Sequence, residues 1–223
     1  MNNFKAEYVN HNNFPVLFGS LLLFFVGISF FDTEDNSLLV ELLLFQVFAA
    51  GTYTISKSGK IFKSAALIGG IFILLRLAAY YLSDRDNIFM ILSIFFMVFF
   101  MAIILKNILG YILKTSDVNV NLILGVISGY LLLGVLFSFC FALAEVLEGT
   151  AINFESTPEF KDILYFTMIT QTTVGYGDLS PISDTARFLS YSLGVVGQLY
   201  MGIVMAFIIG KFLQTSPEEK KKD

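Results

Sequence analysis

Long apolar stretches separated by short polar segments recur along the whole chain. A helix needs about 20 apolar residues, within a range of roughly 17 to 25, to cross the hydrocarbon core of a bilayer. Six stretches are long enough, and they cover residues 15–31, 37–55, 65–82, 88–105, 122–147 and 185–213. The pattern therefore predicts an all-α integral membrane protein with six transmembrane helices.

A seventh apolar stretch, residues 160–171, has only 12 residues and is too short to cross. The run Thr-Thr-Val-Gly-Tyr-Gly-Asp follows it at residues 172–178. Exposed backbone at membrane depth is tolerated only where it lines a cavity. Gly175 and Gly177 can adopt left-handed conformations at little cost, so successive carbonyls can turn to one side. The sequence predicts a re-entrant helix followed by a loop whose carbonyl oxygens face a pore.

Charged residues in the loops predict the orientation, because Lys and Arg prefer the cytoplasmic side. Lys57, Lys60 and Lys63 occupy the second loop, and the tail at residues 214–223 is rich in lysine. The loops on the opposite side, including residues 148–162, are mainly acidic. We expect a multi-pass protein of the cell membrane, plasma or bacterial inner, with both termini cytoplasmic.

Composition narrows the class of protein further. Only 14% of the residues are charged and 56% are hydrophobic, whereas a soluble domain carries about 25% charged residues. The single cysteine, Cys140, excludes a disulfide within the chain. No His, Cys or acidic cluster has metal-ligand spacing, and no nucleophile has a recognisable base. An enzyme is not expected, nor is a cofactor or a nucleic-acid partner; membrane lipids are expected partners.

The chain divides into three parts. Residues 1–114 form a predicted four-helix transmembrane domain, residues 115–213 a pore domain, and residues 214–223 a short charged cytoplasmic tail. Polar and apolar residues alternate at helical spacing over residues 106–114, which predicts an interfacial helix leading into the fifth span.

The order span, acidic loop, short helix, glycine-rich loop and span resembles the pore module of the tetrameric potassium channels, whose filter carries the same residues. The resemblance covers about 90 residues, some 40% of the chain. It implies a homotetramer, because a closed ring of carbonyls needs four loops. It also implies that K⁺ is the only metal ion bound, and that it is coordinated at the filter. The implied coordinating residues are Thr173, Val174, Gly175, Tyr176 and Gly177.

The resemblance also implies residues that support the filter. Thr172 and Asp178 flank it, and Tyr176 is expected to act as a strut against Tyr165 and Phe166 of the short helix. Many relatives have a tryptophan whose indole donates a hydrogen bond to the aspartate. This chain has no tryptophan, so we expect the Tyr165 hydroxyl to donate that hydrogen bond to Asp178.

Two glycines and three larger apolar residues in the last span are candidates for gating. Gly197 falls where relatives have the hinge of the pore-lining helix, and Gly202 keeps the family's spacing; helix packing through small residues explains Gly197 equally well. Met201, Met205 and Ile209 recur every four residues on one face. They are expected to line the inner pore, although such residues are also ordinary core residues.

Two charged residues, Glu41 and Arg76, lie inside predicted spans. Intramembrane charges are costly unless paired, so we expect an ion pair with a structural role. A voltage-sensing fourth span carries several arginines. Residues 88–105 carry no charge, which predicts little intrinsic voltage sensing.

These features favour a potassium-selective channel that conducts K⁺ passively through its filter. One alternative is a weakly selective cation channel on the same scaffold. Another is a non-conducting regulatory subunit that binds a channel partner through its four-helix domain.

Overall fold

The computed structural model describes residues 13–30, 37–55, 67–72, 74–75, 88–115 and 118–215. The labelled elements are α1 (Phe14–Phe30), α2 (Ser37–Ile55), α4 (Ile88–Lys114), α5 (Val120–Glu148), α6 (Phe160–Gln171) and α7 (Asp184–Thr215). Residues 67–72 and 74–75, within the predicted third span, are also helical. The helical fold agrees with the prediction from the sequence.

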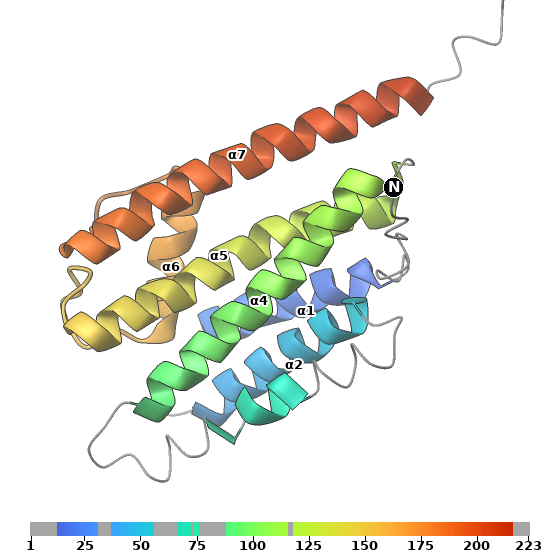
Figure 1. The fold of residues 1–223 in the computed structure, drawn as a ribbon. Helices are drawn as coiled ribbons and strands as arrows, with labels where there is room; N and C mark the ends of the chain where they lie inside the picture. The colour runs from blue at the N-terminus through green and yellow to red at the C-terminus, as the bar shows by residue number, and fades with distance from the viewer. Residues whose placement is uncertain are drawn as a thin grey trace, which may run out of the picture.

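Helix α5 occupies the centre of the molecule. It packs against α1, α4, α6 and α7, and α1 in turn packs against α2 (Figure 1). Over an apolar stretch of 18 residues in each helix, 61% of α5 is buried inside the structure but only 22% of α7. The short α6 contacts α5 and α7 near one end of the bundle. Helix α7 therefore leaves most of its surface uncovered by its own chain.

Three described helices are long and apolar enough to cross a membrane. They are Ile88–Leu113, Val120–Glu148 and Asp184–Lys211, and they correspond to the fourth, fifth and sixth predicted spans. Two shorter apolar helices, Phe14–Phe30 and Val40–Thr54, correspond to the first and second. The third predicted span lies largely outside the described residues. The helices are those of a multi-pass membrane protein, and the number six stays a prediction.

Helix α4 differs from the prediction at its C-terminal end. It runs without interruption from Ile88 to Lys114, so the expected interfacial helix at residues 106–114 is the continuation of the fourth span. The physical reason is that the buried stripe does not stop at residue 105. Ile104, Ile108 and Ile112 recur every four residues, and each is almost fully buried. Neither glycine nor proline separates the two parts, and the helix continues.

Polar side chains and one glycine set the ends of α5 and α6. The Asn119 side chain accepts a hydrogen bond of 2.9 Å from the backbone N–H of Leu122 and caps the start of α5. Gly149 follows its last turn with φ of +75°, a conformation that glycine adopts without a steric penalty. At the start of α6, the Asp162 carboxylate accepts the backbone N–H of Glu159 at 2.9 Å.

Two glycines, four residues apart on α5, let neighbouring helices approach closely. A Cβ atom at Gly125 would lie 3.2 Å from the ring of Phe14 on α1, and one at Gly129 would lie 2.3 Å from the Tyr200 hydroxyl on α7. That hydroxyl donates a hydrogen bond of 2.8 Å to the backbone carbonyl of Val126. Helix α5 is therefore fitted to α1 on one side and to α7 on another.

Lys211 connects the C-terminal part of α7 to the end of α4. Its ammonium donates hydrogen bonds to the backbone carbonyls of Ile112, at 2.7 Å, and of Thr115. Carbonyls in the last turn of a helix lack intrahelical partners and carry partial negative charge. The ammonium therefore caps α4 and connects α7 to the first half of the chain.

Candidate functional site

The site predicted from the sequence begins where α6 ends, at Thr172. The Thr172 hydroxyl donates a hydrogen bond of 2.7 Å to the carbonyl of Met168, one turn back, and its backbone N–H bonds the same carbonyl at 3.0 Å. The next backbone N–H groups, those of Val174 and Gly175, both bond the carbonyl of Ile169, at 3.0 and 3.1 Å. The end of α6 thus holds the first half of the loop in place.

The backbone of this loop has left-handed residues at every second position. The φ angles are +62° at Thr173, +50° at Gly175 and +82° at Gly177. The sequence predicted this conformation for the two glycines. Thr173 was not predicted to share it, because a β-branched residue is an outlier at positive φ. Such strain is found where a ligand site requires a particular backbone, and no sequence signal identifies it.

The second half of the loop is fixed by a side-chain hydrogen bond. The hydroxyl of Tyr165 on α6 donates to the Asp178 carboxylate at 2.7 Å. The expectation that Tyr165 replaces the missing indole donor is confirmed. This hydrogen bond holds the pKa of Asp178 below its ordinary value, because it stabilises the ionised carboxylate.

The predicted contact between Tyr176 and Phe166 is wrong. Phe166 is only 3% exposed, and it faces α5, where its ring meets that of Phe141 edge-on at 5.1 Å. Tyr176, by contrast, is 74% exposed, and Val174 is 51% exposed. Adjacent residues of a helix point in different directions, so of Tyr165 and Phe166 only Tyr165 faces the loop. The Tyr176 side chain is thus largely uncovered in the single chain, and the Val174 side chain is about half covered.

A clamp joins the segment before α6 to the segment after the loop, and the sequence analysis missed it. Ile152 and Pro181 form an isolated antiparallel bridge. The backbone N–H of Asn153 bonds the carbonyl of Ser180 at 3.1 Å, and the Asn153 side chain accepts the N–H of Ser180. Glu145, in the last turn of α5, accepts the N–H of Ala151 at 2.9 Å. The sequence feature that could have indicated this clamp was Gly149, which ends α5 four positions before Asn153.

Gln171, the last residue of α6, was also missed. It is fully buried, and its side-chain amide donates to the carbonyl of Tyr130 on α5 at 2.8 Å, while the Tyr130 hydroxyl donates to the Gln171 carbonyl at 3.2 Å. A Cβ at Gly134 would lie 2.4 Å from the amide oxygen of Gln171, so that glycine makes room for it. The sequence feature that could have indicated this contact was an amide side chain at the end of the short helix, directly before the glycine-rich loop.

The gating candidates lie on an unbroken helix, since α7 is helical from Asp184 to Thr215. A Cβ at Gly197 would lie 3.4 Å from Gln171, so this glycine packs beneath the loop, whereas a Cβ at Gly202 would meet nothing within 4 Å. Met201, Met205 and Ile209 are all exposed in the single chain. These three lie on an open face, and whether they line a pore stays a prediction.

Of the predicted ion pair, Glu41 lies half-buried in α2 and Arg76 lies outside the described residues. The pair therefore stays a prediction.

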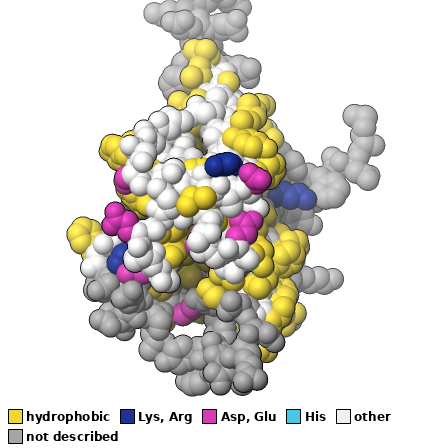
Figure 2. Space-filling model, turned by 90° about the vertical axis from the view of Figure 1, so that its left-hand side faces the viewer, with side chains coloured by type: hydrophobic (Ala, Val, Ile, Leu, Met, Phe, Trp, Pro, Cys, Tyr) yellow, Lys and Arg dark blue, Asp and Glu magenta, His cyan; other side chains and the backbone are white. Residues whose placement is uncertain are grey.

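Acidic side chains surround the end of the molecule that holds the loop (Figure 2). Residues 145–187 contain seven acidic residues and two basic ones. Lys161 pairs with Glu159 at 2.9 Å, and Arg187 lies 3.6 Å from Asp184. A surface with an excess of negative charge raises the local concentration of cations.

Comparison with known proteins gives matches to part of the chain, and the match to a family model includes this site. Residues 125–214 match the family model described as "Ion channel". The human potassium voltage-gated channel subfamily A member 4 is 33% identical over 107 residues, which are 48% of this chain and 15% of that protein. Two-pore potassium channel 1 of Arabidopsis thaliana is 36% identical over 93 residues, 41% of this chain and 24% of that protein.

A third relative, two pore potassium channel a of Oryza sativa subsp. japonica, is 38% identical over 79 residues, 35% of this chain and 20% of that protein. The chain thus spans between 15% and 24% of the length of these three relatives. No solved structure matches the chain significantly. The matches, together with the loop between α6 and α7, support a relationship between this chain and the potassium channels.

Proposed function

We propose that the chain is one subunit of a homotetrameric, potassium-selective channel of the cell membrane, with six spans and both termini in the cytoplasm. Thr173, Val174, Gly175, Tyr176 and Gly177 coordinate K⁺ in this proposal. The observation that carries it is the backbone of the loop. Left-handed residues at positions 173, 175 and 177 alternate with Val174 and Tyr176, which lets successive carbonyl oxygens face one axis.

Four copies of such a loop would replace the hydration shell of a dehydrated K⁺ ion with oxygen. The surfaces left open by a single chain support this assembly. The Val174 and Tyr176 side chains are exposed, and 22% of the α7 span is buried. Neighbouring subunits would cover these apolar surfaces around a fourfold axis, and the negative end of the α6 dipole would face the cation.

The distribution of charge supports the orientation. The end of the molecule with the loop is acidic, whereas the C-terminal ends of α4 and α7, which hold Lys114 and Lys211, lie at the opposite end (Figure 1). In a membrane, the basic end faces the cytoplasm. The loop then opens to the outside, where its acidic surroundings attract cations.

The decisive experiment is recording from the purified full chain in planar bilayers under a K⁺/Na⁺ gradient. We expect a reversal potential close to the K⁺ equilibrium potential and block by barium. A reversal potential near zero would instead establish the weakly selective channel. Absence of any K⁺ flux from liposomes containing the protein alone, with tetramers verified in the same sample, would favour the regulatory subunit.

A further inference from the structure

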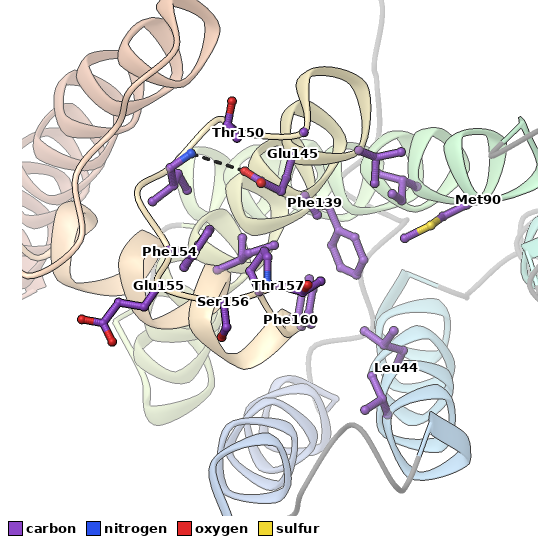
Figure 3. Close-up of a pocket in the computed structure, with 18 residues that line it drawn as sticks. Leu44, Met90, Phe139, Glu145, Thr150, Phe154, Glu155, Ser156, Thr157 and Phe160 are labelled. Atoms are coloured by element: carbon purple, nitrogen blue, oxygen red, sulfur yellow. Dashed lines mark hydrogen bonds between the residues drawn. The ribbon is translucent and has the colours of Figure 1, made fainter.

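A cavity of about 590 Å³ lies between the first half of the chain and the pore domain. It is at the same end of the molecule as the loop, between α2 and α4 on one side and α5, α6 and the segment 149–158 on the other (Figure 3). Cavities of roughly 300 to 1,000 Å³ with apolar walls and a few polar groups are typical of small-molecule sites. The size therefore fits one ligand with a moderately long apolar body.

The inner walls of the cavity are apolar. Leu44 on α2 and Met90 on α4 face Phe139 on α5 and Phe160 on α6 across it. The rings of Phe139 and Phe160 lie 4.9 Å apart and are tilted against each other. An alkyl or aryl chain in this space gains contact with both halves of the protein, and the aromatic faces also attract a cation.

The rim of the cavity carries the Glu145 carboxylate. Glu145 Oε2 accepts two backbone hydrogen bonds, from Ala151 at 2.9 Å and Ile152 at 3.3 Å. Glu145 Oε1 has no hydrogen-bond partner among the described residues, whereas the Glu155 carboxylate on the loop points away from the cavity (Figure 3). Within the described ranges, no basic side chain pairs with Glu145. A half-buried carboxylate beside an apolar cavity favours a cationic partner.

We propose that this cavity binds an amphipathic monovalent amine. The apolar body lies between α2, α4 and α5, and the ammonium group bonds Glu145 Oε1 near Phe139. The charge of Glu145 decides the class, because an anionic amphiphile would be repelled by this carboxylate and a neutral one would supply no charge to pair with it. This site is separate from the filter and does not depend on ion conduction.

The test is photolabelling of the full-length protein in nanodiscs with decylammonium that carries a diazirine at the end of its chain. We expect mass spectrometry to find the label on cavity residues such as Leu44 and Met90. Unlabelled decylammonium should compete about tenfold better than decanol, since a hydrogen bond to a charged group is at stake. Decanoate should compete least.

Glu145→Gln keeps an acceptor for the Ala151 and Ile152 N–H groups but removes the charge, and it should weaken labelling about tenfold. Glu148→Gln removes the same charge from the same helix end outside the cavity, and it should label like the parent. Met90→Trp should reduce labelling by filling the space.

Equal labelling of the parent and Glu145→Gln would overturn the proposal. Competition by decanol or decanoate equal to that by decylammonium would also overturn it, as would label confined to outward-facing residues of α4 such as Phe95. If Glu145→Gln fails to fold, the order of competition in the parent protein decides the proposal, because it varies the charge of the ligand without a substitution in the chain.

Discussion

Tyr130 on α5 and Gln171 at the end of α6 are joined by two hydrogen bonds that run in opposite directions. The Gln171 amide donates to the Tyr130 carbonyl at 2.8 Å, and the Tyr130 hydroxyl donates to the Gln171 carbonyl at 3.2 Å. Because Gln171 directly precedes the loop, this pair fixes the base of the loop to the central helix. A change in either residue should therefore be detected both in stability and in ion selectivity.

Replacing Gln171 with leucine keeps a side chain of similar volume but removes the donor to the Tyr130 carbonyl. We expect the free energy of unfolding to fall by about 1 to 3 kcal/mol, because a buried polar interaction is lost. Thermal unfolding of the protein in detergent measures this. Tyr130→Phe, which removes the longer of the two bonds, should cost about 0.5 to 1.5 kcal/mol. A double mutant whose loss equals the sum of the two single losses would show that the two bonds do not act as a pair.

Replacing Gly177 with alanine should abolish K⁺ selectivity. Its φ of +82° is in the left-handed region, where alanine is less stable than glycine by about 1 to 2 kcal/mol. The substitution would therefore move the backbone of the loop out of this conformation. Reversal potentials under a K⁺/Na⁺ gradient measure the effect. Gly19→Ala is the matched control, since it lies in α1 with no atom near its Cβ. An alanine at position 177 with unchanged selectivity would contradict the assignment of this loop as the filter.

The Tyr165–Asp178 hydrogen bond predicts a pH dependence at the outer end of the site. The folded pKa of Asp178 lies below the ordinary value of 3.8. The stabilisation is therefore complete above the ordinary value and is lost as the pH falls through the lowered folded value. Tyr165→Phe should raise the folded pKa and shift inhibition by external acid to higher pH.

Currents recorded while the external pH is lowered measure this shift. Tyr191→Phe removes an exposed hydroxyl on α7 instead, and it should leave the acid titration where the parent has it. Identical titrations for Tyr165→Phe and the parent would show that the hydrogen bond does not govern the protonation of Asp178.

Opening should depend only weakly on voltage. The only charged residues of α4 are Lys106 and Lys114, both in its C-terminal part. A strongly voltage-gated channel moves three or four charges per subunit, whereas here we expect about four or fewer per tetramer. The slope of the conductance–voltage curve gives this number. A slope that requires ten or more charges, or one that becomes much shallower in Lys106→Gln, would contradict the prediction.

The sequence predicted those features that depend on local pattern. Residues 160–171 form the helix α6 with the expected bounds, and the Tyr165 hydroxyl bonds Asp178 as expected, because both depend on helix length and on short-range spacing. The orientation of Phe166 was mispredicted because only the packing of α5 decides which of two adjacent aromatic rings is buried. The continuation of α4 was missed because the polar residues at 106–114 give the sequence pattern of an interfacial helix. Only the structure shows that apolar residues between them are buried in line with those of the fourth span.

Other features depend on contacts between residues far apart in the chain. The pair Tyr130–Gln171 spans 41 positions, and the fit of Tyr200 over Gly129 spans 71. The two glycines at positions 125 and 129 formed a recognisable motif for close helix packing. That motif does not reveal which ring or hydroxyl approaches each glycine. The positive φ of Thr173 has no signal in the sequence, because its cause is the hydrogen bonding at the end of α6.

The contact between Phe14 and Gly125 has a consequence for attempts to shorten or recombine this protein. The ring of Phe14 is fully buried against α5, so α1 covers the surface around Gly125. A fragment that begins near Val118 would expose this surface and is expected to associate through it. A chimera with the first half of another channel should fold well only if that half presents an aromatic ring at the same place.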